Sequence, residues 1–205
     1  VAFLPFAFFI AYGVMSIPSG ILVEKYGEKV VMIIAFLISS LGASLFAGSP
    51  SFGMYMVSLF FIGTGMAMLQ VAINPLLRVA GGEEHFAFNS VIGQLFFGLA
   101  SFLSPLVYSY LVLNLSNENG ASNFLLDTLS GIVPENLPWI SLYWVFAFVS
   151  LLMVFIIGFS KMPKVERKED EMVGALQTHF DLLKDPMVLL YFFGIFAYVG
   201  SEQGV

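Results

Sequence analysis

The sequence contains no cysteine, and only eight of its 205 residues are lysine or arginine. The absence of cysteine excludes disulfides, thiolate catalysis and cysteine-ligated metals. Histidine is also scarce, since His85 and His179 are the only two, and no pair of carboxylates falls within an apolar run. We therefore expect no metal site, no cofactor and no enzyme active site in these residues. The sequence also lacks a basic patch that could neutralise phosphates, which excludes nucleic-acid binding.

Apolar residues dominate what is present. Hydrophobic residues make up 59% of the chain and charged residues only 11%, and the mean hydropathy is +0.91. A water-soluble domain needs more charge than this to cover its surface. Six apolar runs are each close to the ~20 residues that an α-helix needs to cross a bilayer. They are residues 1–23, 30–48, 52–77, 86–113, 139–160 and 187–205. The sequence predicts an all-α integral membrane protein.

The basic residues are confined to three places, which are residues 24–29, Arg78 and residues 161–184. The connections between them, residues 49–51 and 114–138, carry no basic residue. Because basic loops favour the cytoplasmic side of a membrane, this alternation predicts that the three basic stretches lie inside. Residues 173–183 have the pattern of a short amphipathic helix on the membrane surface, although a solvated linker explains this stretch more simply.

The most specific motif follows the first apolar run, where residues 20–29 are GILVEKYGEK. This motif resembles the G-x-x-x-D-R-x-G-R-K loop of the major facilitator superfamily, which joins that family's second and third helices. The matching positions are Gly20, Glu24, Lys25, Gly27 and Lys29. The resemblance implies a loop that helps to set the balance between inward-open and outward-open states.

Each residue type in this motif also has a physical use of its own. Gly20 allows two helices to approach closely, and Gly27 permits a tight turn. The charged side chains can latch the ends of neighbouring helices on the inner side. Glu28 departs from the family pattern because it places an acid where the family has a base.

The superfamily resemblance implies a major facilitator-like helical bundle of twelve helices, of which about six are present here. Residues 1–160 would be an N-terminal half-bundle that lacks its first helix. Residues 161–186 would be the cytoplasmic linker between the two halves, and residues 187–205 would begin the second half as a truncated seventh helix. The remaining helices of the same polypeptide are then expected partners, together with the lipid bilayer.

Three further segments give a narrower resemblance. Residues 69–75 are LQVAINP, residues 81–83 are GGE, and residues 93–98 are GQLFFG. These segments are similar to the fucose permease branch, a group of sugar:cation symporters, in its fourth helix, the following loop and its fifth helix. The last residues, YVGSEQG at 198–204, are similar to that branch's seventh helix. The resemblance implies transport of a small sugar of the fucose or hexose type.

The same resemblance suggests the residues that bind the sugar, which are Gln70, Asn74, Gln94 and Glu202. Two positions depart from the branch. Gln70 stands where many relatives carry a glutamate associated with proton coupling, and glutamine does not titrate. Phe97 stands where relatives use an asparagine that contacts the sugar. The coupling ion, H⁺ or Na⁺, therefore stays open at this point.

Elementary energetics favours the same residues, because polar groups at membrane depth are costly and usually face a bundle interior or a wet cavity. Gln70 and Asn74 are four residues apart and share one helical face. Amides offer both donors and acceptors to sugar hydroxyls. The alternative is that these amides join neighbouring helices or bond the carbonyls freed by Pro75, and for Asn74 this is the preferred interpretation. Glu202 is the only ionisable residue deep within a run, and pairing with another helix is its alternative role.

The sequence thus favours a secondary active transporter that moves a small sugar by alternating access, in a bacterial inner membrane. Two alternatives remain, a carrier of a non-sugar solute within the same superfamily and a non-transporting receptor of the same fold.

Overall fold

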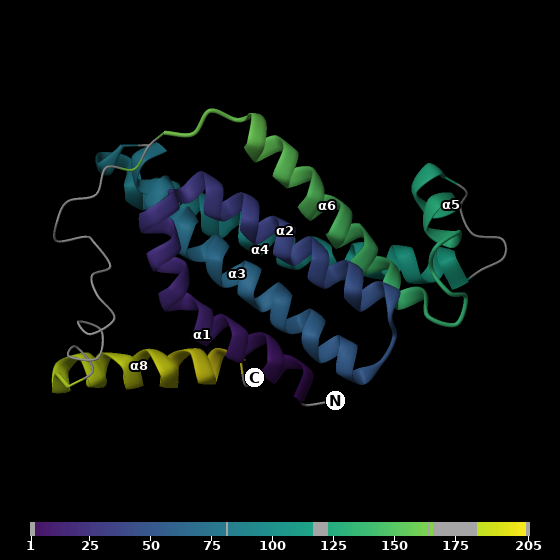
Figure 1. The fold of residues 1–205 in the computed structure, drawn as a ribbon, viewed down its shortest axis with the longest axis horizontal. Helices are drawn as coiled ribbons and strands as arrows, with labels where there is room; N and C mark the ends of the chain where they lie inside the picture. The colour runs from purple at the N-terminus through teal and green to yellow at the C-terminus, as the bar shows by residue number, and fades with distance from the viewer. Residues whose placement is uncertain (1–2, 81, 117–122, 164, 166–183, 204–205) are drawn as a thin grey trace. The chain divides into compact units, whose positions relative to one another are not determined.

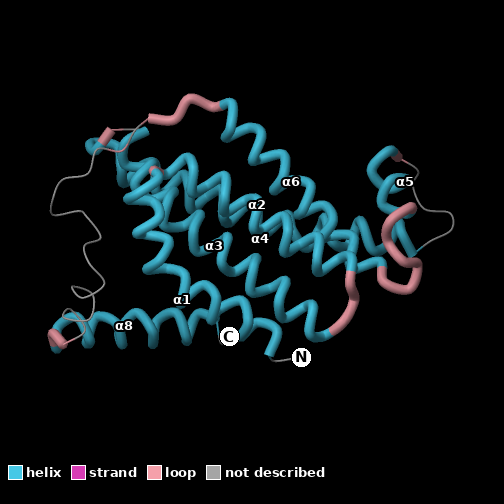
Figure 2. The backbone as a smooth tube through the Cα atoms, viewed as in Figure 1, coloured by secondary structure: helices cyan, strands magenta, loops and turns pink. Residues whose placement is uncertain are grey.

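A computed structural model describes residues 3–80, 82–116, 123–163, 165 and 184–203. Within these ranges the chain is helical, and no residue lies in a strand (Figure 2). The chain divides into two compact units, Val1–Glu166 and Arg167–Val205. The first unit contains five long helices, α1 (Phe3–Tyr26), α2 (Glu28–Gly48), α3 (Phe52–Ala80), α4 (Phe86–Ser116) and α6 (Ser141–Phe159).

Shorter helices connect these long ones. The 3-10 helix η1 (Glu83–His85) precedes α4, and α5 (Phe124–Ser130) and η2 (Pro138–Ile140) lie between α4 and α6. The second unit contains α8 (Pro186–Gln203). The Oδ1 atom of Asp185 begins α8 by accepting a hydrogen bond of 2.8 Å from the backbone N–H of Met187.

Five helices in the described part of the chain are long and apolar enough to cross a membrane. These five spans correspond to the first five predicted crossings, so the prediction of an all-α membrane protein is confirmed. The sixth predicted crossing forms α8, which has 18 residues and is not among the five spans. Its role as a crossing remains a prediction, and the predicted amphipathic helix at residues 173–183 lies outside the described residues.

The first span extends further than predicted. We placed its end at residue 23, but α1 continues to Tyr26 and includes Gly20, Glu24 and Lys25. The charged side chains at its end are helix formers and point into solvent, so they do not stop the helix. Gly27 ends it, because its backbone adopts a φ of +81°, which only glycine adopts without strain. The predicted tight turn at Gly27 is therefore present.

Glycines let three of the long helices pack at close range. A Cβ atom added to Gly63 of α3 would collide with the carbonyl oxygen of Phe8 in α1. A Cβ atom added to Gly65 would lie 2.7 Å from the carbonyl oxygen of Ala35 in α2, and would also collide with the Ser39 hydroxyl. Helix α3 thus lies between α1 and α2 at distances that larger residues would prevent.

Two polar contacts attach α6 to α2. The Ser40 hydroxyl donates a hydrogen bond of 2.9 Å to the carbonyl oxygen of Ala147 in the membrane span. The Nζ atom of Lys29 donates to the carbonyl oxygens of Gly158 and Ser160, each at 2.8 Å. The last turn of α6 is therefore bound by the residue that closes the GILVEKYGEK motif.

The helix ends agree with the alternation of basic residues. The ends of α1, α3 and α6, which precede the three basic stretches, lie at the same end of the bundle, on the left in Figure 1.

The opposite end carries a stack of aromatic rings from α2, α3, η2 and α6. Phe46 stacks on Tyr143 with ring centroids 3.7 Å apart and on Tyr55 at 4.3 Å, and Trp139 meets Phe46 edge-on at 6.1 Å. Aromatic rings of this kind are enriched where a membrane meets water.

Candidate functional site

The amides of α3 lie on a face of that helix that the other described helices leave uncovered. Gln70 and Asn74 are both exposed, as are Met66 and Ile73 beside them. The residues of α3 between these positions, among them Met68 and Ala72, are buried in a cluster with α1, α2 and α6. The exposed residues 66, 70, 73 and 74 follow the helical repeat, so they form one stripe along α3.

Gln94 lies at a similar depth on the neighbouring helix α4. Gln70 is ten residues from the inner end of α3 at Ala80, and Gln94 is eight residues from the inner end of α4 at Phe86. At 1.5 Å of rise per residue these separations are about 15 Å and about 12 Å. The two amides therefore lie at similar heights along their helices, each within a candidate membrane span.

The stripe on α3 leads directly to α4. Leu77 continues the stripe two turns beyond Gln70, and a Cβ atom on Gly93 would lie 3.8 Å from the Cδ1 atom of Leu77. Gly93 is the residue before Gln94, which is itself exposed. The structure therefore brings the two predicted glutamine positions onto adjacent helices that touch at Leu77 and Gly93.

None of the three amide side chains bonds to any residue that the structure describes. No hydrogen bond joins Gln70, Asn74 or Gln94 to the described ranges of the chain. The preferred sequence interpretation of Asn74 was helix joining or bonding of the carbonyls freed by Pro75, and within those ranges it does neither. Helix α3 runs through Pro75 to Ala80 without a break. The side chain of Glu202 lies outside the described residues, although its backbone belongs to α8.

An uncovered amide at this depth has a clear physical meaning. Lipid tails offer amides no hydrogen bonds, so exposure to lipid would cost free energy. A stripe of this kind must face water, a ligand or other polypeptide, and its donors and acceptors are available to bind one of these. Phe97 of α4 lies one helical turn beyond Gln94 and is 69% exposed, which adds an aromatic surface beside the amide.

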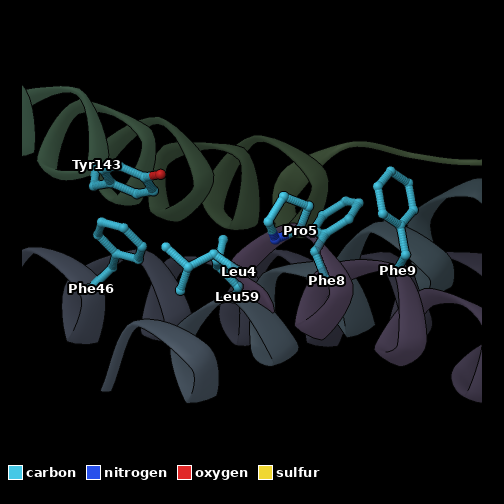
Figure 3. Close-up of a pocket in the computed structure, with 7 residues that line it drawn as sticks. All are labelled: Leu4, Pro5, Phe8, Phe9, Phe46, Leu59 and Tyr143. Carbon is cyan, nitrogen blue, oxygen red and sulfur yellow. The ribbon is translucent and has the colours of Figure 1, made fainter. Parts of the chain in front are cut away.

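A hollow near the opposite end of the bundle differs in character from the amide stripe (Figure 3). Its volume is about 530 Å³, and only the Tyr143 hydroxyl adds a polar group to its side-chain lining. The lining residues are Leu4, Pro5, Phe8, Phe9, Phe46, Leu59 and Tyr143. No predicted site residue lines this hollow. The hollow could not be predicted from the sequence, because phenylalanines occur in every predicted span.

Acids and histidines do not gather in the described ranges of the chain. No group of three His, Asp or Glu residues in those ranges is placed to hold a metal ion. His85 lies in η1, at the inner end of α4. The described candidate site is thus built from neutral amides and an aromatic ring, which suits the binding of a neutral polar molecule.

Comparison with known proteins shows the family to which this chain belongs. The sequence model of the Major Facilitator Superfamily matches residues 1–204. The chain belongs to this superfamily. It is therefore a multi-pass integral membrane chain from a family of transporters rather than from a family of enzymes.

Two curated relatives and one crystal structure refine this result. The chain is 29% identical over 203 residues to a glucose/galactose transporter of Brucella abortus (strain 2308), covering 98% of this chain and 46% of that relative. It is 28% identical over 172 residues to the L-fucose-proton symporter of Escherichia coli (strain K12), covering 78% of this chain and 38% of the symporter. The crystal structure of the superfamily transporter FucP in its outward conformation aligns with a TM-score of 0.64 at 27% identity, covering 89% of this chain and 46% of FucP.

These comparisons confirm both the predicted superfamily and the predicted fucose permease branch. The chain spans about half the length of the curated relatives that it matches. The predicted division at residues 160 and 186 stays a prediction, because most of the intervening stretch lies outside the described residues.

Proposed function

We propose that this chain is part of a secondary active transporter that moves a small neutral sugar, of the hexose or deoxyhexose type, across a bacterial inner membrane. The observation that supports this most directly is the set of exposed amides within the candidate spans α3 and α4, which bond to no residue that the structure describes. Relatives named as glucose/galactose transporters and L-fucose-proton symporters support the same class of substrate.

The three amides have distinct parts in this proposal. Gln70 and Gln94 hydrogen-bond the sugar hydroxyls from adjacent helices, and Asn74 extends the binding surface one turn towards the inner side. Phe97 supplies a flat apolar surface for one face of the sugar ring. Glu202 adds a polar contact or a charge linked to the coupling cation, from the part of the polypeptide that begins with α8.

Alternating access requires that the half-bundle containing α1 to α6 rock against the rest of the polypeptide. We assign Gly20, Glu24, Lys25, Gly27 and Lys29 to setting the balance between the two open states. The contact between Lys29 and the last turn of α6 supports this part of the proposal, since it joins the motif to the helix that leads into the linker. A cation, H⁺ or Na⁺, drives accumulation of the sugar.

Uptake by the complete protein tests the proposal. Labelled hexoses and deoxyhexoses are offered to vesicles that contain the full-length protein, with proton and sodium gradients imposed separately. We expect accumulation of at least one sugar under one of the gradients. Gln70→Ala and Gln94→Ala should each raise the apparent KM by about 2-fold to 10-fold, the value of one lost hydrogen bond.

Met66→Ala is the matched control, because Met66 lies one turn from Gln70 on the same exposed stripe and carries no hydrogen-bonding amide. It should leave the KM for the sugar unchanged. If the two glutamine variants transport as well as the control variant, the assigned site is wrong. If no sugar accumulates under either gradient, a carrier of another solute or a receptor replaces the proposal.

A further inference from the structure

The loop between α4 and α6 folds back onto the bundle instead of extending into water. Asn123 begins α5 and makes two hydrogen bonds there. Its Oδ1 atom accepts from the backbone N–H of Leu126 at 2.9 Å, and its Nδ2 atom donates to the Tyr110 hydroxyl at 2.8 Å. Tyr110 lies six residues before the end of α4 at Ser116, which is about 9 Å along the helix. The start of α5 is therefore held beside the last turns of a membrane span.

A small apolar core fixes the rotation of α5. Leu126, Leu129 and Val133 are buried together with Leu111 of α4. Side chains near the start of α6, including Leu142 and Val145, pack against this cluster. The face of α5 that carries Leu126 and Leu129 consequently points towards α4 and α6.

Three large apolar side chains of this segment are uncovered, beside the exposed polar side chains of Asp127 and Thr128. Phe124 is 88% exposed, Leu125 is 45% exposed and Ile132 is 50% exposed. Soluble surface loops rarely leave three large apolar side chains together in water. We call Phe124, Leu125 and Ile132 the outer apolar face.

The surroundings of this face identify what covers it. Tyr110 and Leu113 of α4 are 44% and 63% exposed within a candidate membrane span, and the Tyr110 hydroxyl contacts the residue before Phe124, so an uncovered part of α4 lies beside the start of α5. The aromatic rings of Trp139 and Tyr143 lie at the same end of the bundle, where the membrane meets water. Figure 1 shows α5 running across the direction of α4 and α6, which places it along the membrane plane.

We propose that α5 is an interfacial anchor whose outer apolar face inserts at the boundary between the headgroups and acyl chains of the outer leaflet. The partner is the lipid surface itself. The buried face holds α5 on the bundle, so insertion of the other face fixes the depth of the ends of α4 and α6 in the membrane.

The absence of cysteine from these residues allows a direct test. In the full-length protein, with any cysteine elsewhere replaced, single cysteines at Phe124 and Ile132 are labelled with a nitroxide and the protein is placed in lipid vesicles. Collisions with lipid-soluble oxygen and with a water-soluble nickel chelate are then compared. Glu135 is the matched control, since it is exposed in the same loop but is charged.

We expect the ratio of oxygen to nickel collisions to be several-fold higher at positions 124 and 132 than at position 135. Equal ratios would mean that the face lies in water and would overturn the proposal. Labels shielded from both reagents would also overturn it, because the face would then be covered by polypeptide. As a second measurement, with Trp139, Trp144 and any tryptophan elsewhere in the full-length protein replaced by phenylalanine, the fluorescence of Phe124→Trp should be quenched by lipids brominated near the headgroup. Unquenched fluorescence would contradict insertion.

Discussion

Lys29 offers the sharpest test of how the inner end of the bundle is held together. Its ammonium group donates to two carbonyl oxygens at the end of α6, those of Gly158 in the last turn and of Ser160 directly after the helix, each at 2.8 Å. These carbonyls belong to a helix end, where the backbone dipole carries partial negative charge. Lys29→Met removes the charge and both hydrogen bonds while it keeps a stem of similar length.

The cost follows from these contacts. A hydrogen bond from a charged donor contributes about 1.5–3 kcal/mol, and the helix dipole adds about 0.3–1 kcal/mol. Lys29 is partly exposed and the bond to Gly158 lies at the surface, so water replaces much of what is lost. We therefore expect a cost of about 1–2 kcal/mol, which is roughly a 5-fold to 30-fold increase in local opening of the last turn of α6.

Hydrogen–deuterium exchange of the full-length protein measures this opening. The backbone N–H of Ser160 donates to the carbonyl oxygens of Ile156 and Ile157, at 3.0 Å and 3.2 Å, so its exchange reports whether the turn is closed. Lys25→Met is the matched control, because the Nζ atom of Lys25 lies 5.2 Å from the ring centroid of Tyr26 and forms no bond to α6. If both variants exchange alike in this turn, the reasoning is refuted.

Three further changes test the packing and the site. Gly65→Ala should destabilise the protein by about 1–3 kcal/mol through the forced separation of α2 and α3, seen as a lower melting temperature in detergent, whereas Gly53→Ala in the same helix meets nothing within 4 Å and should not. Ser40→Ala removes the bond between α2 and α6 and should cost about 0.6 kcal/mol by the same assay, and Ser44→Ala, which loses a bond within one helix, should cost less. Gln70→Glu introduces a titratable group where relatives carry glutamate and should make the pH profile of sugar uptake differ from that of the native protein; identical pH profiles for the two proteins would contradict a position of Gln70 at the binding site.

The first five predicted spans were accurate because each depends on neighbours in the sequence. A run of apolar residues must form an α-helix in a membrane to satisfy its own backbone, whatever the rest of the chain does. The structure differs from the prediction at the end of one span and within the outer loop. Helix α1 continued through Glu24 and Lys25, since charged residues at the membrane surface do not interrupt a helix and only Gly27 does. Helix α5 was not predicted within the outer loop, because its seven residues are too short to be helical without tertiary support.

The candidate site was also predictable only in part from the sequence. The shared face of Gln70 and Asn74 follows from their spacing of four residues, and the sequence predicted it. That this face is the uncovered one could not be predicted, because α1 and α2 cover the other sides of α3 through contacts such as that between Gly65 and Ala35. Gln94 was predicted as a site residue only through the resemblance to the fucose permease branch. The structure added that Gln94 lies on a helix adjacent to α3, because Gly93 lies close to Leu77.

The sequence by itself determined that this chain spans a membrane and which residues share a helical face, since these properties arise from composition and from periods of a few residues. The superfamily was indicated by the resemblance of residues 20–29 to a family motif. The tertiary structure decided which faces are covered and which distant groups meet. Lys29 and Ser160 are 131 residues apart in the chain, and Tyr110 receives the amide of Asn123 only because α5 folds back onto α4. Contacts of this kind depend on how whole helices pack, and no local pattern in the sequence encodes them.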